Sequence, residues 1–166
     1  MAQLPLYELE YYEPLLISLK KKWIDAIILG QKRHEFRRTF FRKPSCAFVY
    51  VVAPHSVISH VVWLGEPIIA PPSDIAAIAE RERPGGSQSI LEYLGDRQVG
   101  FAIPIVGVNS IRPLTLSEIR SHFPSFMPPQ HYIRLSRHPR LLELIMSHAR
   151  DVVNRETFTP LKPSIA

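Results

Sequence analysis

The amino-acid sequence predicts an α+β fold, in which a mixed β-barrel of about six strands carries flanking helices and a C-terminal helix. Two observations carry this prediction. Short runs of β-branched and aromatic residues recur along the chain, which is typical of buried strands. The helical patterns gather near the start, in the middle and at the end, whereas a doubly wound sheet would need strands and helices to alternate. The length of 166 residues fits a single domain with a sizeable core.

The first predicted elements are a strand, a helix and a glycine stop. Residues 15–19 form a short apolar run bounded by a proline and by lysines, which favours a buried strand. Apolar residues then recur at helical spacing over residues 23–28, and Gly30 follows as a residue suited to the left-handed conformation at a helix end. Residues 35–38 are expected to be extended, so that Glu35 and Arg37 share one face of a strand.

Further strands are predicted in the middle of the chain and near its end. Residues 47–53 form a continuous β-branched and aromatic run, the pattern of a strand buried on both faces. Residues 57–69 continue in the same way, with Gly65 and Pro67 indicating a bulge or a bend. Residues 99–108 and 130–135 complete the predicted set.

The predicted helices follow from capping residues and from spacing. Residues 73–83 open with Ser73 and Asp74 as N-cap candidates, and residues 89–94 follow a Pro-Gly-Gly-Ser break with Ser87 or Ser89 as the cap. Residues 116–122 predict one or two helical turns, and apolar residues near 3.6 spacing predict a C-terminal helix over residues 139–153.

The domain organisation is expected to be simple, because no linker and no internal repeat divides the chain. We expect an N-terminal arm over residues 1–14, a barrel domain over residues 15–135, and a C-terminal helix and tail over residues 136–166 packed on the same domain. The start of the chain lacks the pattern of a signal peptide, and no apolar run is long enough to cross a bilayer. These observations predict a cytoplasmic protein without a membrane partner.

The positive charge of the protein is concentrated in one stretch. Residues 20–43 hold nine Lys and Arg and two acids, a local charge of +7. The rest of the chain holds 20 − 9 = 11 basic and 15 − 2 = 13 acidic residues, a net charge of −2. Such a distribution favours a basic face for an anionic partner, although a solvated basic surface would look the same in the sequence.

Several separated pieces of the sequence resemble one family. The spacing of Gly30, Lys32, Glu35 and Arg37 is similar to the G-x-K-x-x-E-x-R signature of ASCH domains, and it follows a strand and a helix as it does there. The segments AFVYVVAP, LEYLG with GFAI, PLTL and PPQHYIRL resemble later family segments in the same order, so that the likeness covers roughly residues 15–135. The resemblance implies a PUA-like β-barrel with a cleft beside the early helix.

The same resemblance implies a function in binding RNA or a nucleotide-like ligand, with a regulatory role as one reading. A small branch of the family resembles amidohydrolases that remove an acetyl group from a modified cytidine, using a lysine, a threonine and a glutamate. Lys32 matches that lysine, but Glu35 stands where the branch has its threonine, which counts against transferring the reaction.

The candidate site follows from the residues and from this resemblance together. Lys and Arg supply phosphate contacts, and aromatic side chains stack on unpaired bases. The predicted partner is therefore RNA, single-stranded nucleic acid or a modified nucleoside. If the protein is an enzyme, an amidohydrolase or a ribonuclease, Lys32 and Glu35 are the candidate catalytic residues. The candidate ligand-binding residues are Lys32, Glu35, Arg37, Arg38, Phe40, Arg42 and Lys43.

Other classes of function have weaker support. The only cysteine, Cys46, lies in an apolar run, which indicates a buried side chain. The seven histidines form no zinc motif, and no G-x-S-x-G elbow is present, so we expect no metal and no cofactor. Apolar residues of the C-terminal helix leave a protein-interaction adaptor as a further alternative, although they would equally well cap the barrel. The ligand, any reaction and the oligomeric state stay open.

Overall fold

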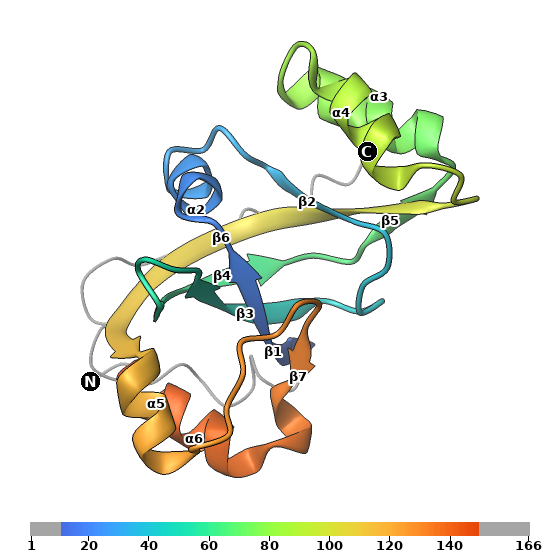
Figure 1. Ribbon diagram of the computed structural model, residues 1–166. Helices are drawn as coiled ribbons and strands as arrows, with labels where there is room; N and C mark the ends of the chain where they lie inside the picture. Colours follow the sequence, from blue (N-terminus) through green and yellow to red (C-terminus); the bar gives the residue numbers. More distant parts are fainter. Residues whose placement is uncertain (1–10, 150–166) are drawn as a thin grey trace.

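The computed structural model describes residues 11–149, which form a curled sheet with helices at its two ends (Figure 1). The strands are β1 (Glu13–Leu19), β2 (His34–Arg37), β3 (Ser45–Val51), β4 (Val57–Leu64), β5 (Ile68–Ala70), β6 (Gly100–Thr115) and β7 (Ile133–Arg134). The helices are α2 (Lys21–Ile28), α3 (Pro72–Glu82), α4 (Gly86–Leu94), α5 (Leu116–His122), η1 (Leu135–Arg137) and α6 (Pro139–Ala149).

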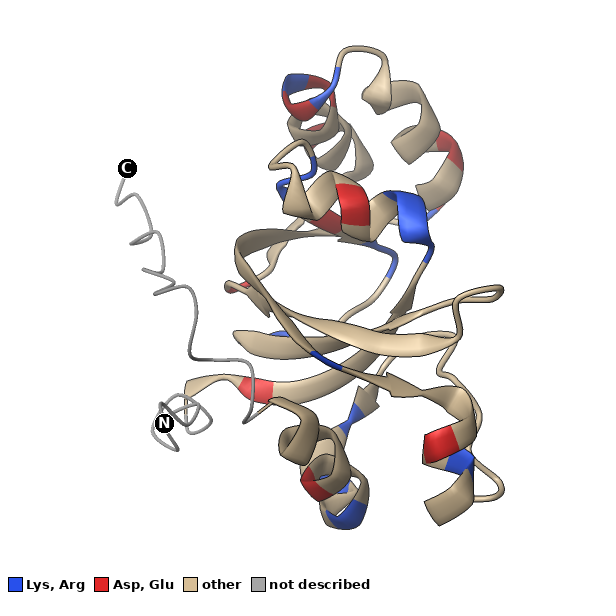
Figure 2. Ribbon diagram, turned by 90° about the vertical axis from the view of Figure 1, so that its left-hand side faces the viewer, with Lys and Arg blue, Asp and Glu red and all other residues tan. Residues whose placement is uncertain are grey.

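The sheet has seven strands in the order β2-β6-β4-β3-β1-β7, with β5 also paired to β6. Only β1 and β3 pair in parallel, and the chain between them contributes α2 and β2. Figure 2 shows the sheet curling round an interior, with charged residues mainly on helices and connecting segments. The predicted α+β fold with a mixed β-barrel and flanking helices is confirmed, and the curled sheet forms a half-barrel. The strand count exceeds the expected six because the predicted run over residues 57–69 divides at Gly65 into β4 and β5.

The core is built on both faces of the sheet. All seven residues of β3 are buried, which confirms the predicted strand. Phe48 and Tyr50 belong to a cluster shared with α5 and α6. Ala47 and Val49 belong to a second cluster, to which α2 adds residues such as Ile24. Side chains alternate along a strand, so β3 separates these two clusters. The face of α6 that carries Leu141 and its neighbours is buried against the sheet, as expected for a helix that caps the barrel.

Helices α3 and α4 form a hairpin beyond the paired ends of β2, β5 and β6 (Figure 1). A small cluster joins this hairpin to the sheet, with Ile75, Leu94 and Ala102 buried and Phe36 packed against them. At Gly100 the chain passes close beneath Leu94, and a Cβ atom placed there would lie 2.6 Å from a Leu94 methyl carbon. The hairpin therefore stands next to β2, the strand that carries Glu35 and Arg37 of the predicted site.

The predicted caps of the hairpin helices are wrong. Helix α3 begins at Pro72, because proline suits the first helical position, and Ser73 and Asp74 lie inside the first turn. Helix α4 has Gly85 at its N-cap with φ of 86°, and no serine caps it. The carboxylate of Glu80 instead accepts hydrogen bonds from the N–H groups of Gly85 and Ser87, at 2.9 and 3.0 Å.

The ends of the chain differ from the expected boundaries. Strand β1 begins at Glu13, two residues before the predicted start, and the rest of the predicted arm over residues 1–10 lies outside the described residues. The last predicted strand, residues 130–135, is reduced to β7. The backbone before β7 forms hydrogen bonds with side chains and not with a neighbouring strand, since Pro129 O accepts from Ser18 Oγ and His131 O accepts from Arg37. The tail from residue 150 onward also lies outside the described part of the chain.

Candidate functional site

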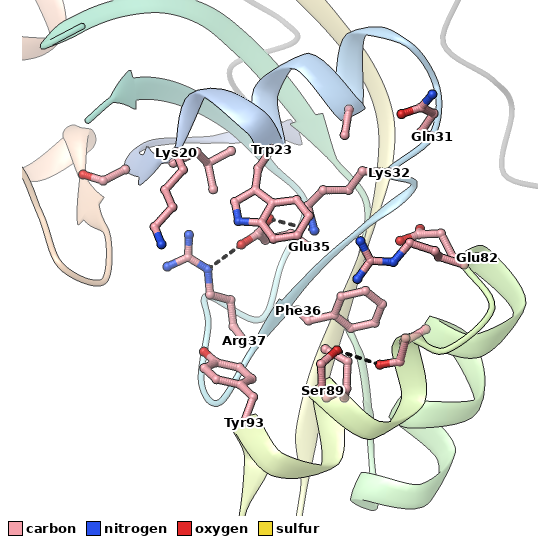
Figure 3. A pocket seen from close by; sticks show the side chains of 17 residues that line it. Lys20, Trp23, Gln31, Lys32, Glu35, Phe36, Arg37, Glu82, Ser89 and Tyr93 are labelled. Atoms are coloured by element: carbon pink, nitrogen blue, oxygen red, sulfur yellow. Dashed lines mark hydrogen bonds and ion pairs between the residues drawn. The ribbon is translucent and has the colours of Figure 1, made fainter. Parts of the chain in front are cut away.

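A pocket of about 460 Å³ lies between α2 and the α3–α4 hairpin, and β2 crosses it. Its lining comes from four parts of the chain, namely the end of β1, helix α2, residues 31–37 and the hairpin. Figure 3 shows Trp23 of α2 at the top, Tyr93 of α4 at the bottom and Arg37 between them, with Lys32 and Glu35 next to the Trp23 ring. The pocket therefore lies beside α2, the early helix of the chain.

The turn after α2 sets the position of Lys32. Leu29 is the C-cap of α2, and Gly30 takes the left-handed conformation with φ of 73°. Gly30 N donates to Ile27 O at 3.0 Å and Gln31 N donates to Ala26 O at 2.9 Å, which is the pattern of a Schellman motif. The motif ends the helix and directs the chain into β2, two residues after Lys32. The predicted glycine stop is confirmed.

Three charged side chains form the floor of the pocket. Arg37 Nε donates to Glu35 Oε1 at 2.9 Å, and Lys32 Nζ lies 3.4 Å from Glu35 Oε2. These side chains are only 9–13% exposed. Strand β2 holds Glu35 and Arg37, which pair with Ile103 and Phe101 of β6 and project to the same side. The prediction that Glu35 and Arg37 share a face is confirmed.

The floor is charged, but one of its acceptors is unused. Lys32 Nζ donates to His34 O at 2.6 Å, and Arg37 Nη1 donates to His131 O at 3.3 Å. Within the described residues, Glu35 Oε2 is buried and accepts no hydrogen bond. Buried polar atoms are normally satisfied, so an unsatisfied carboxylate oxygen in a pocket points to a ligand that donates to it.

Aromatic rings form the walls beside this floor. Lys32 Nζ lies 5.4 Å from the centroid of the Trp23 ring and 5.3 Å from that of the Phe36 ring. Tyr93 is 38% exposed at the opposite wall, with the Arg38 guanidinium 4.7 Å from its ring centroid. Aromatic faces next to cations suit a flat, electron-rich ligand that carries negative charge.

A carboxylate of the hairpin ties α3 to β2. Glu82 Oε1 accepts hydrogen bonds from Arg33 N at 2.6 Å and from His34 Nδ1 at 3.1 Å. Burial raises the pKa of the Glu82 carboxyl, but the hydrogen bonds from His34 and Arg33 outweigh this effect. The nearby charges of His34 and Lys32 act in the same direction as these bonds, so the pKa lies below its ordinary value of 4.5.

The structure brings together only part of the predicted site. Lys32, Glu35 and Arg37 line the pocket, and Arg38 lies at its edge, donating to Tyr93 O at 2.8 Å. Phe40 lies elsewhere, because it is buried and packs on Tyr132 with ring centroids 5.2 Å apart. Arg42 and Lys43 are exposed and lie outside the lining.

Several lining residues were not predicted. The hairpin supplies Glu82, Arg83, Ser89 and Tyr93, which lie about fifty positions further along the chain than Lys32. Trp23 shares the apolar spacing of α2, which is typical of a core residue, yet it lines the pocket. Tyr93 is an aromatic residue of α4 outside the apolar face that carries Ile90 and Leu94, and this position was the one sign of it in the sequence. A single aromatic residue at the surface of a helix does not indicate a ligand site.

Across residues 11–149, His, Cys, Asp and Glu side chains do not gather in any group of three or more that could hold a metal ion. No helix in the described part of the chain has the length and apolar character needed to cross a membrane. Cys46 is buried, as its sequence context predicted.

No protein-family model and no curated protein sequence matches this chain. Solved structures do match it. ASCH from Zymomonas mobilis aligns with a TM-score of 0.68 and 21% identity, over 80% of this chain and 95% of that chain. A serine-to-alanine variant of that protein aligns with a TM-score of 0.66 and 22% identity, over 81% of this chain and 97% of that chain. A tyrosine-to-phenylalanine variant gives a TM-score of 0.65 and 22% identity, over 80% and 98%. The chain therefore has the ASCH fold, and the predicted resemblance is confirmed at the level of the fold.

Proposed function

We propose that this protein binds single-stranded RNA and holds one nucleotide of the strand in the pocket between α2 and the α3–α4 hairpin. One observation carries the proposal. The floor formed by Lys32, Glu35 and Arg37 presents charged hydrogen-bonding groups inside a pocket that has aromatic walls. A nucleotide needs both features, because its base has polar edges and flat apolar faces.

The charge around the pocket suits an anionic ligand. Lys20 and Arg83 line it in addition to Lys32 and Arg37, so that four cations accompany the carboxylates of Glu35 and Glu82. Cations supply the sequence-independent part of nucleic-acid affinity by contacting phosphates and releasing counterions. Arg38 and Arg42 extend the basic surface along the segment after β2, where a strand leaving the pocket would continue.

The volume and the fold support the same proposal. The pocket of about 460 Å³ falls within the range of roughly 300–1,000 Å³ that is usual for small-molecule sites, and a single nucleotide fits this range. The resemblance to ASCH domains implies RNA binding, and a regulatory role would follow from binding without chemistry.

The experiment is a titration of fluorescently labelled single-stranded RNA at several salt concentrations, followed by anisotropy. We expect affinity to fall steeply with salt, and Lys32→Ala to weaken binding at low salt. Tyr93→Ala should weaken binding by about tenfold, because stacking on an aromatic side chain contributes about 1–3 kcal/mol per base. Tyr11→Ala is the matched control, since Tyr11 is an exposed tyrosine at the far end of β1.

Two results would contradict the proposal. Absence of binding to any RNA would remove it altogether. Binding that Lys32→Ala and Tyr93→Ala leave unchanged would place the RNA elsewhere on the protein.

A second function is supported by the contact between Lys32 and Glu35. An amine 3.4 Å from a carboxylate in a pocket is an arrangement used in acid–base and nucleophilic catalysis. The substrates to test are acetylated cytidine, with release of acetate as the readout, and RNA, with chain cleavage as the readout. Turnover that Lys32→Ala abolishes would establish this function. No turnover, or turnover that survives Lys32→Ala, would remove it.

A further inference from the structure

The polar groups on the pocket floor occur in a fixed order. Figure 3 shows the Glu35 carboxylate between Lys32 on one side and Arg37 on the other. Arg37 Nε donates a hydrogen bond of 2.9 Å to Glu35 Oε1, and Lys32 Nζ lies 3.4 Å from Glu35 Oε2. Read across the floor, the order is donor, acceptor, donor.

Each of these groups retains unused hydrogen-bonding capacity. The Lys32 ammonium has three N–H donors, and the described residues supply one hydrogen-bond acceptor for them, His34 O. The Arg37 guanidinium has five N–H donors, and its hydrogen bonds to Glu35 and His131 use two of them. Glu35 Oε2 is buried and, within the described residues, accepts no hydrogen bond. A ligand must therefore donate at the centre and accept on both sides.

The edges of the bases differ in how well they meet this requirement. Uracil presents O4, N3–H and O2 in the order acceptor, donor, acceptor, which matches Lys32, Glu35 and Arg37 in turn. Cytosine and adenine present a ring-nitrogen lone pair beside their amino group, and this lone pair would face the carboxylate. Guanine matches at O6 and N1–H, but its amino group would face the Arg37 guanidinium, a donor against a donor.

We infer that the pocket recognises uracil through the imide edge of the base, with Glu35 as the residue that determines specificity. This inference rests on the proposed function, because it assigns the base that occupies the same pocket. The carboxylate of Glu35 accepts N3–H, while Lys32 and Arg37 donate to the two carbonyl oxygens. The cations on both sides hold the carboxylate in place before the ligand arrives, so its orientation is set in advance.

Burial makes this recognition selective. The Glu35 side chain is 9% exposed, so a base that fails to donate to Oε2 leaves this oxygen without a hydrogen-bond donor. A mismatched base costs about 1–3 kcal/mol at a well-formed contact of this kind, equivalent to roughly tenfold or more in affinity.

The experiment compares single-stranded RNA octamers that differ only in the base. The probes are U8, C8, A8 and an octamer of 3-methyluridine, in which a methyl group replaces the N3–H. We expect wild-type protein to bind U8 at least about tenfold more tightly than each of the other three. The methylated octamer is the decisive probe, because it keeps the uracil ring and both carbonyls and removes only the donor.

Replacing Glu35 tests the assignment of uracil through the protein, as the octamers test it through the RNA. Glu35→Gln should bring the ratio of U8 to C8 affinity close to one, because an amide offers a donor where the carboxylate offers only acceptors. Glu92→Gln, an exposed position on α4 outside the lining, should leave the ratio unchanged. Circular dichroism melting establishes that both variants are folded.

The outcomes separate this inference from the proposed function. Equal binding of U8 and the methylated octamer, or equal binding of U8 and C8, overturns the assignment of uracil and leaves RNA binding in place. Failure of all four octamers to bind overturns both.

Discussion

At the scale of a single residue, Glu35 decides the character of the site. Its carboxylate lies between Lys32 and Arg37, each of which is about nine-tenths buried. A carboxylate between two cations stabilises both of them, and it also leaves one oxygen for a ligand. The same side chain therefore has a structural role, to which the proposed function adds a binding role, and substitutions can separate the two.

The structural role of Glu35 predicts a loss of stability when the side chain is removed. Glu35→Ala should lower the free energy of unfolding by about 3 kcal/mol, because Lys32 and Arg37 then face each other in a largely buried place without a counter-charge. Urea denaturation measures this loss. Adding Lys32→Ala to the variant should recover part of it, since one of the two opposing charges is then gone.

Glu66→Ala is the control for this measurement, because Glu66 is an exposed glutamate between β4 and β5. A loss at Glu35 no larger than that at Glu66 would show that the carboxylate contributes nothing to the stability of the fold.

At the scale of an element, the turn at the end of α2 places the site. Helix α2 buries Ile24 and Ile27 in the core, which sets its position on the sheet. The turn that follows depends on Gly30, whose φ of 73° lies in the left-handed region. Only the backbone conformation restricts this position, because a Cβ atom built on Gly30 would meet nothing within 4 Å.

Substitution at Gly30 should therefore cost stability through the backbone alone. Gly30→Ala should lower the free energy of unfolding by about 1 kcal/mol, the cost of placing a Cβ in the left-handed conformation. Gly30→Asn should cost less, because asparagine tolerates this region better. Thermal or urea unfolding of the two variants tests the order.

Gly65→Ala is the matched control for the turn. Gly65 does not have a positive φ in this range, and an added Cβ would lie at an ordinary 3.6 Å from Val106. If Gly65→Ala destabilised the protein as much as Gly30→Ala, the left-handed turn would not be the cause.

At the scale of the whole molecule, two units meet at the site. The barrel supplies the floor through β2, and the α3–α4 hairpin supplies a wall with only a small apolar cluster beneath it. Glu82 connects the two units by accepting hydrogen bonds from Arg33 N and His34 Nδ1. The connection depends on the ionised carboxylate, because a protonated carboxyl is a weaker acceptor.

This connection predicts a dependence of stability on pH. The pKa of Glu82 in the folded protein lies below the ordinary value of 4.5, so the unfolded state binds the proton more readily. The stabilisation from Glu82 is therefore fully present above pH 4.5 and is lost as the pH falls below this value through the lowered pKa. Urea unfolding between pH 7 and pH 3 should show wild type losing its advantage over Glu82→Gln across that acidic range.

Glu66→Gln is the control for this titration as well. A gap between wild type and Glu82→Gln that stayed constant from neutral to acidic pH would contradict a role for the ionised carboxylate in joining hairpin and barrel.

Features of the fold that depend on neighbouring residues could be predicted from the sequence, and features that depend on distant contacts could not. Burial on both faces of β3 could be read from a continuous apolar run, and the end of α2 from Gly30, because spacing and backbone preference act within a few residues. The caps of α3 and α4 could not be read in this way. Helix α4 uses Glu80 of the preceding helix as its N-terminal acceptor, and such a contact leaves no local pattern.

The α+β class and the charged part of the candidate site follow from the sequence, since Lys32, Glu35 and Arg37 lie on one short segment. Alternation along β2 puts Glu35 and Arg37 on one face, and the turn at Gly30 places Lys32 beside them. Only the tertiary structure decided that Trp23 and Tyr93 face this floor, and that Phe40 is buried away from it. The physical reason is that a pocket is the space between packed elements. Its walls depend on how α2 and the hairpin pack on the sheet, which no single segment encodes.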